Sequence, residues 1–151
     1  MRILAENRKA YLNYEILEKF EAGLVLIGQE VKSIKLGRAN LAGSYVVFKG
    51  LELCLVGCTI PAYQPANAPP DYNPQRSRKV LLKKTEISYL IGKSKEKRLT
   101  LVPLKMYSKS GKIKLECALV KSRRKADKRE VIKKRETERE IERALKVRGE
   151  A

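Results

Sequence analysis

The sequence predicts a mainly β protein: a small antiparallel barrel of the oligonucleotide-binding type, with two or three short helices and a basic helical tail. Three observations support this fold class. Short runs of alternating apolar and polar residues recur through the first 120 of the 151 residues, with turn-forming residues between them. Strands and helices do not alternate in the order that a parallel sheet requires. The last 31 residues contain 13 Lys or Arg and no proline or aromatic residue.

The first 60 residues predict a basic arm, several strands and one helix. Alternation of apolar and polar side chains starts at Tyr14, and Ala22-Gly23 predicts a turn after the first strand. Val31 and Ile34 have helical spacing, and Gly37 is placed to end that helix. The predicted elements are an arm at 1–13, strands at 14–20, 24–27, 44–48 and 52–60, and a helix at 29–36.

The next 60 residues predict a loop, a helix and a β-hairpin. Residues 61–74 contain five of the six prolines and therefore form a loop. Thr85 is the expected N-cap of a helix that ends at Gly92. Strands at 99–107 and 112–120 are expected to pair across Ser110-Gly111. Short antiparallel strands of this number hide their edges by closing into a small barrel.

The tail, residues 121–151, predicts a long basic helix that does not pack on its own domain. Two apolar groups, Val131-Ile132 and Ile141-Ala144-Leu145, are separated by eight charged or polar residues, so the helix cannot bury a continuous apolar stripe. Asp127 and Glu130 have the spacing of a capping box and predict the start of the helix. We therefore divide the chain into a body at 1–120 and a tail at 121–151 that becomes ordered on its target.

Excess positive charge is spread over the whole chain. The sequence has 34 Lys or Arg against 17 Asp or Glu, a net charge of +17, and the body alone has 21 basic and 10 acidic side chains. A strongly basic surface favours a polyanion such as nucleic acid as the partner. The alternative is a solvated basic surface without a specific ligand.

The sequence predicts neither an enzyme nor a metal protein. There is no histidine to act as a base or a ligand, and no phosphate-loop or nucleophile-elbow motif. Cys54 and Cys58 would lie about 13 Å apart along a strand, too far for a disulfide, and together with Cys117 they are interpreted as small buried residues. The first residues have no apolar core typical of a signal peptide, and no apolar run approaches the roughly 20 residues that span a bilayer. We expect a cytoplasmic protein without catalytic residues, cofactor, metal or membrane association.

Seven segments taken together resemble one family. They are NRKA at 7–10, EAG at 21–23, GQEVKS at 28–33, NL at 40–41 with SY at 44–45, NPQRSRKVLL at 73–82, LVPLK at 101–105 and DKR at 127–129. In this order and spacing they resemble the small protein B family, the SsrA-binding proteins of bacterial trans-translation. The resemblance extends from about Asn7 to Lys146.

The resemblance implies a small antiparallel barrel that binds the tRNA-like domain of transfer-messenger RNA (SsrA RNA) near its elbow. It also implies delivery of the alanylated RNA, with elongation factor Tu as an indirect partner, to 70S ribosomes stalled without a codon in the A site. There the tail would enter the decoding centre and the empty mRNA channel, beside small-subunit rRNA, and would be helical when bound to the ribosome. The protein is expected to act as a monomer.

Carried over by position, the resemblance implies two sets of site residues. The RNA-binding set is Asn7, Arg8, Lys9, Glu21, Glu30, Lys32, Ser33, Asn40, Arg76, Arg78, Lys79, Leu81, Lys114, Lys121, Arg123 and Arg124. The ribosome-binding tail set is Asp127, Lys128, Arg129, Lys133, Arg135, Ile141, Leu145 and Lys146. One departure is visible at 122–124, where SRR replaces the usual GKK, so the resemblance does not extend to a glycine hinge there, although arginine retains phosphate binding.

Some of these residues have alternative roles. Glu21 and Glu30 can accept hydrogen bonds from base amino groups, or they can form internal ion pairs. Leu81 is alternatively a core leucine, and Tyr45, which could stack on a base, is more simply a core tyrosine. At the level of function, the alternatives to an RNA-binding adaptor are a structural ribosomal protein with a basic extension and a nuclease.

Overall fold

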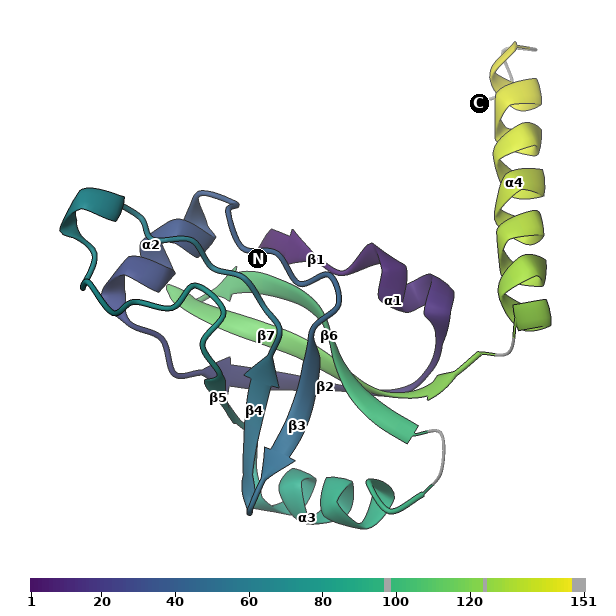
Figure 1. Ribbon diagram of the computed structural model, residues 1–151. Coiled ribbons are helices and arrows are strands. Elements are labelled where there is room, and N and C mark those ends of the chain that lie inside the picture. Colours follow the sequence, from purple (N-terminus) through teal and green to yellow (C-terminus); the bar gives the residue numbers. More distant parts are fainter. Residues whose placement is uncertain (97–98, 124, 148–151) are drawn as a thin grey trace.

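A computed structural model describes residues 1–96, 99–123 and 125–147 (Figure 1). Its N-terminal half contains β1 (Arg2–Glu6), α1 (Arg8–Asn13), β2 (Tyr14–Leu24), α2 (Gly28–Lys35), β3 (Tyr45–Lys49) and β4 (Glu52–Val56). There follow a 3-10 helix η1 (Pro65–Asn67), β5 (Arg78–Leu81), α3 (Lys84–Lys93), β6 (Leu99–Lys109), β7 (Lys112–Ser122) and α4 (Lys125–Val147).

Strands β2 to β7 of the described residues close into an antiparallel barrel. Neighbouring strands follow the order β6-β3-β4-β5-β2-β7, and β7 also pairs with β6, so the ring of pairings is complete. β1 pairs with residues 105–108 of β6. β3 and β6 form the weakest junction, because their register has a single residue pair, Val46 with Leu101. The predicted mainly antiparallel fold is confirmed.

Two apolar clusters hold the barrel together. The interior is filled by side chains such as Leu55, Leu90, Met106 and Leu115, each at most 1% exposed. A second cluster lies on the outer face of β6 and β7, where Ala10 of α1 packs against the strands. Because β6 and β7 are covered on both faces here, residues 101–104 and 117–120 are continuous buried runs without polar alternation.

The N-terminal third differs from the sequence prediction in two ways. The arm at 1–13 is structured, because residues 2–6 form β1 and residues 8–13 form α1. The turn predicted at Ala22-Gly23 is wrong, since β2 runs without interruption to Leu24. Ala22 pairs with Leu115 and Gly23 pairs with Lys114, so cross-strand pairing with β7 overrides the local turn signal.

The predicted helix boundaries are displaced, although the helices themselves are present. α3 starts after Lys83 rather than after Thr85, because the Glu86 carboxylate accepts a hydrogen bond from the Lys83 backbone amide at 3.2 Å. α4 starts at Lys125, so Asp127 lies inside the helix and not at its N-cap. The hairpin of β6 and β7 across Ser110-Gly111 is confirmed, and β7 continues to Ser122, two residues past the expected end of the body.

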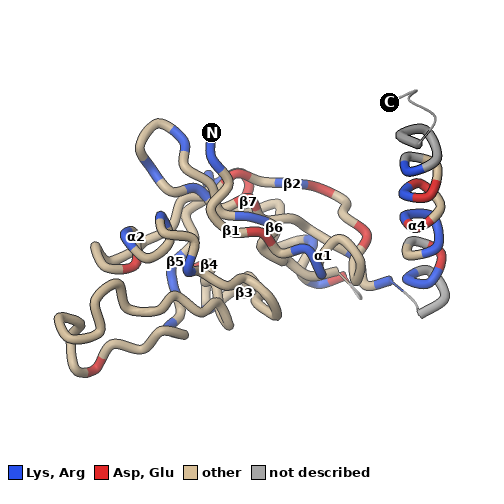
Figure 2. Tube along the Cα trace, turned by 90° about the horizontal axis from the view of Figure 1, so that it is seen from above, with Lys and Arg blue, Asp and Glu red and all other residues tan. Residues whose placement is uncertain are grey.

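Helix α4 stands apart from the barrel beside the end of α1 (Figures 1 and 2). The Arg123 backbone amide, just before the helix, donates a hydrogen bond to the Asn13 carbonyl at 3.1 Å. Every described side chain from Arg129 to Arg143 is exposed. The helix therefore buries no stripe against its own body, as expected from its interrupted apolar pattern.

Among the described residues, the three cysteines form no disulfide and no helix is suited to a membrane. Cys54, Cys58 and Cys117 are buried and free. Burial raises the pKa of the Cys58 thiol to about 11 and that of the Cys117 thiol to about 12, so both stay protonated at neutral pH. None of the helices described is long and apolar enough to cross a bilayer.

Gly57 directly follows β4 and has a left-handed backbone conformation that is strained for residues with a side chain. Its φ is +77°, and a Cβ atom there would lie 3.3 Å from the Gly43 carbonyl oxygen. Gly57→Ala is expected to lower the free energy of unfolding by about 1–3 kcal/mol in urea titrations. Gly28→Ala is the matched control, because Gly28 starts α2 with open space around it. An equal loss in both variants would contradict this account.

Candidate nucleic-acid interface

The residues expected to bind RNA fall into an exposed group and a buried group. Asn7, Glu30, Ser33 and Arg78 are at most 5% exposed, so a bound RNA does not reach their side chains in this conformation. Arg124 lies outside the described residues. The exposed members are Arg8, Lys9, Glu21, Lys32, Asn40, Lys79, Leu81 and Lys121, and the half-buried ones are Arg76, Lys114 and Arg123.

One groove brings together Leu81 and Lys114, which come from distant parts of the sequence. It has a volume of about 350 Å³ between β2, α2, β5 and β7, and we call it the leucine groove. Leu81 is 47% exposed, because alternate residues of β5 face outward and Arg78 and Val80 take the inward positions. Its lining residues are Gly23, Leu24, Leu26, Val31, Leu81, Gly111, Lys112, Ile113 and Lys114.

The leucine groove offers apolar walls with ammonium groups at one side. Leu81 is therefore an exposed contact residue of the groove and not a core leucine. Lys112 is exposed and Lys114 is half-buried, and both come from β7. Apolar walls can pack on a ribose or an unstacked base, while lysines bind the phosphates that flank it.

Glu21 lies next to this groove and is held by neighbours on β6. Its carboxylate accepts a hydrogen bond from the Tyr107 hydroxyl at 2.6 Å and forms an ion pair with Lys109 at 3.2 Å. The Tyr107 hydrogen bond, followed by that of Lys109, holds the pKa of Glu21 below its usual value. The internal ion pair expected as an alternative is therefore present, and it leaves the Glu21 side chain 43% exposed as an acceptor.

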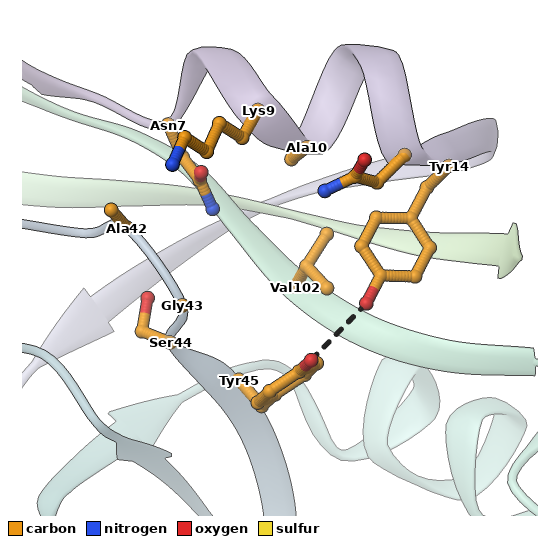
Figure 3. A pocket seen from close by; sticks show the side chains of 10 residues that line it. Asn7, Lys9, Ala10, Tyr14, Ala42, Gly43, Ser44, Tyr45 and Val102 are labelled. Atoms are coloured by element: carbon orange, nitrogen blue, oxygen red, sulfur yellow. Dashed lines mark hydrogen bonds between the residues drawn. The ribbon is translucent and has the colours of Figure 1, made fainter. Parts of the chain in front are cut away.

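A second pocket lies between α1, the 41–44 turn and β3 (Figure 3). Its volume is about 340 Å³, and Asn7, Lys9, Tyr14 and Tyr45 are among its lining residues. The Tyr14 hydroxyl donates a hydrogen bond to the Tyr45 hydroxyl at 3.3 Å. Burial and this hydrogen bond raise the pKa of Tyr14 to about 12, so the phenol is neutral at physiological pH. Two tyrosine rings in a pocket that an exposed lysine also lines suit an unstacked base and its phosphate.

Asn7 and Tyr45 have different positions in this pocket from those expected. Asn7 is buried because its side-chain amide donates to the Pro103 carbonyl at 2.9 Å, so it orders the start of α1. The prediction that Tyr45 belongs to the core is wrong, because it is 40% exposed while its neighbour Val46 faces inward. The alternation of the strand was a signal that could have placed Tyr45 outside, because its neighbour Val46 is apolar and faces inward. Tyr14 was not among the candidate site residues expected from the sequence.

A cluster of four polar side chains, which we call the clasp, consists of the fully buried Glu30 and Arg78 and the half-buried Tyr72 and Arg76. The Glu30 carboxylate accepts hydrogen bonds from the Arg76 Nε at 3.0 Å and from the Arg78 Nε at 2.7 Å. It also accepts the Ile27 backbone amide at 3.0 Å and so caps its own helix, α2. The alternative role of Glu30, an internal ion pair, is thus the one that the structure contains.

Arg78 is fully buried and uses its guanidinium to join separate backbone segments. Besides Glu30, it donates to the Cys58 carbonyl at 2.8 Å and to the Pro74 carbonyl at 2.9 Å. The Tyr72 hydroxyl accepts from Arg78 at 3.3 Å and donates to the Ile60 carbonyl at 2.6 Å. These bonds satisfy the buried charges, because burial of a cation is tolerated when it is paired and hydrogen-bonded.

The clasp keeps Glu30 ionised. Burial on its own would raise the pKa of the carboxyl, but hydrogen bonds from Arg76, the Ile27 amide and Arg78 outweigh it and lower the pKa. Ser33, on the same helix, is also fully buried, which removes it from the surface that an RNA could touch.

The residues expected in the tail are partly described. Arg129, Lys133, Arg135 and Ile141 are exposed on α4, and Lys128 is half-buried. The side chains of Asp127, Leu145 and Lys146 lie outside the described residues, although their backbone belongs to α4. The basic side chains of α4 that the structure describes are therefore largely open to solvent.

A basic antiparallel barrel with an apolar groove beside lysines defines a small RNA-binding barrel protein. A family model described as SmpB protein matches residues 4–147. The chain is 50% identical over 147 residues to the SsrA-binding protein of Carboxydothermus hydrogenoformans, covering 97% of this chain and 98% of that one. It is 49% identical over 145 residues to that of a Sulfurihydrogenibium species, covering 96% and 95%.

A solved structure supports the same family. A chain from "tmRNA-SmpB: a journey to the center of the bacterial ribosome" matches with a TM-score of 0.67 and 40% identity, covering 87% of this chain and 95% of that chain. This chain therefore belongs to the SmpB family, and the resemblance inferred from its motifs is confirmed.

The ionised state of Glu30 predicts a pH-dependent stability. At neutral pH, Glu30→Gln is expected to lower the free energy of unfolding by about 3 kcal/mol, because it leaves the buried Arg78 partly uncompensated. The lowered pKa means that this contribution is complete above the unfolded value of 4.5 and is lost as the pH falls through the folded value. Urea titrations at several pH values check both statements.

Glu52→Gln is the control, because Glu52 pairs with Lys79 at the surface and both side chains are about half exposed. Its effect is expected to be within about 1 kcal/mol. A wild-type advantage over Glu30→Gln that persists unchanged to pH 3 would refute the assigned charge state.

Proposed function

We propose that this chain is an RNA-binding adaptor that binds the tRNA-like domain of transfer-messenger RNA and enables rescue of stalled ribosomes by trans-translation. Its near full-length similarity to SsrA-binding proteins carries the proposal. A neighbour whose solved structure concerns tmRNA, SmpB and the ribosome supports the same partners. Family membership favours the adaptor over a structural ribosomal protein or a nuclease.

The RNA-binding surface of the proposal comprises the exposed residues around the leucine groove and the pocket beside α1. Lys112 and Lys114 would bind phosphates while Leu81 packs on a sugar or base. Lys9, which lines the same pocket as Tyr14 and Tyr45, would form a second point of contact (Figure 3). The two sites lie at opposite ends of β2, because Tyr14 pairs with Ser122 of β7 and Gly23 pairs with Lys114.

The tail of the proposal acts in the decoding centre and the empty mRNA channel. Arg135, Arg139 and Arg143 are four residues apart and therefore lie on one face of α4. Like charges at this spacing destabilise an isolated helix by about 0.2–0.5 kcal/mol per pair. A polyanion along that face removes the repulsion, so small-subunit rRNA is the natural target of this arginine row.

The proposed role needs no catalysis by this chain. It places the chain in the cytoplasm, as a monomer that meets elongation factor Tu through the alanylated RNA. Exposed cations supply affinity through counterion release, and the barrel supplies the fixed geometry in which they are presented.

Lys114→Gln tests the leucine groove. It is expected to weaken binding to a transcript of the tRNA-like domain and to reduce the slope of log affinity against log salt by about 0.7–0.9, the value for one phosphate contact. Lys93→Gln is the control, since Lys93, the last residue of α3, is paired with Glu96. Titration from about 50 to about 300 mM salt by fluorescence anisotropy, roughly threefold below to twofold above physiological ionic strength, measures both slopes. Equal slopes for Lys114→Gln and the wild type would remove the groove lysine from the interface.

Replacing Arg135, Arg139 and Arg143 together by Gln tests the tail. Affinity for the tRNA-like domain should stay unchanged, while peptide tagging on ribosomes stalled at the end of a truncated mRNA should be lost. Gln at Glu130, Lys134 and Glu138 is the matched control, because these residues form a row with the same spacing on another face of α4. Loss of RNA affinity in the arginine variant would show that the tail binds the tRNA-like domain itself. Loss of tagging in the control variant would show that tagging does not depend specifically on the three arginines.

A further inference from the structure

The clasp joins the two walls of the leucine groove. Glu30 precedes Val31 on α2, and Val31 lines the groove. Arg78 lies on β5, the strand that ends with the groove residue Leu81. The hydrogen bond from Arg78 Nε to the Glu30 carboxylate, at 2.7 Å, therefore connects the helix on one side of the groove to the strand on the other.

The clasp also fixes the proline-rich loop that connects β4 to β5. Arg78 and Tyr72 bind the carbonyls of Pro74 and Ile60 from inside the molecule. From outside, the Gln29 side chain donates to the Asn67 carbonyl at 2.9 Å, and Lys32 lies 5.4 Å from the centre of the Tyr63 ring. Helix α2, the loop and β5 thus form one rigid unit that carries both Val31 and Leu81 of the groove.

We infer that the clasp sets the geometry of the leucine groove, with Glu30 and Arg78 as positioning residues that do not touch the RNA. The inference rests on the proposed RNA-binding function and adds to it the way in which two buried charges act. Both side chains are fully buried, so their effect on RNA passes through Val31 and Leu81. A preformed groove binds with less loss of conformational entropy than a mobile one.

Positioning and direct contact predict different changes in RNA affinity when the charge of Glu30 or of Arg78 is removed. If the two side chains faced RNA phosphates, removal of the Glu30 charge would raise the affinity and removal of the Arg78 charge would lower it. If they position the groove, both removals loosen the same bond and lower affinity together. Direct contact by Arg78 would also contribute to the salt slope, whereas a buried residue that releases no counterion leaves the slope unchanged.

The experiment compares full-length Glu30→Gln and Arg78→Gln with the wild type, using a transcript of the tRNA-like domain. Anisotropy titrations at several salt concentrations are run at a temperature where circular dichroism shows each protein folded. Both variants are expected to bind about tenfold more weakly, with the slope of the wild type. Lys35→Gln is the exposed control on the same helix, because it removes a charge outside the clasp, and it should not show the tenfold loss.

Tyr72→Phe keeps the test decisive should a charge variant fail to fold. It removes one hydroxyl from the clasp without changing any charge, and it should also weaken binding while leaving the slope unchanged. Stronger binding by Glu30→Gln, a shallower slope for Arg78→Gln, or wild-type affinity in all folded clasp variants would each overturn the inference. Failure of the wild type to bind the transcript would instead overturn the proposed function, so the two failures are distinguishable.

Discussion

The pairing of Glu30 with Arg76 and Arg78 is the interaction on which the rest of the described surface depends. Without its partners, a carboxylate at this depth would be neutral or would destabilise the fold. With them, it caps α2, holds β5 and orders the proline-rich loop. One buried acid therefore connects the secondary structure of the body to the shape of its groove.

The distribution of the remaining charge follows from that pairing. Two arginines of a strongly basic chain point inward, onto Glu30, and are largely withdrawn from any phosphate. Among the cations that stay available are those on the outer faces of α2 and β7 and along α4, and Figure 2 shows basic residues in each of these elements. The closed barrel keeps the first two groups in fixed positions, while α4 carries the third away from the body.

Much of the fold was readable from the sequence, because local patterns determined it. The hairpin across Ser110-Gly111 and the proline-rich loop each depend on a few neighbouring residues. The interior position of Arg78 was not readable, since its partner Glu30 lies 48 residues away and an arginine in a basic motif looks the same whether it faces RNA or a carboxylate. The turn expected at Ala22-Gly23 failed for a related reason, because pairing with β7 is a tertiary contact.

The most direct measurement is a structure of the full chain bound to the tRNA-like domain of transfer-messenger RNA. The account predicts RNA in the leucine groove, with phosphates beside Lys114 and the sugar or base against Leu81. It also predicts that the hydrogen bond between Glu30 and Arg78 stays intact and enclosed. An Arg78 guanidinium turned outward onto a phosphate, with Glu30 facing the RNA, would contradict it.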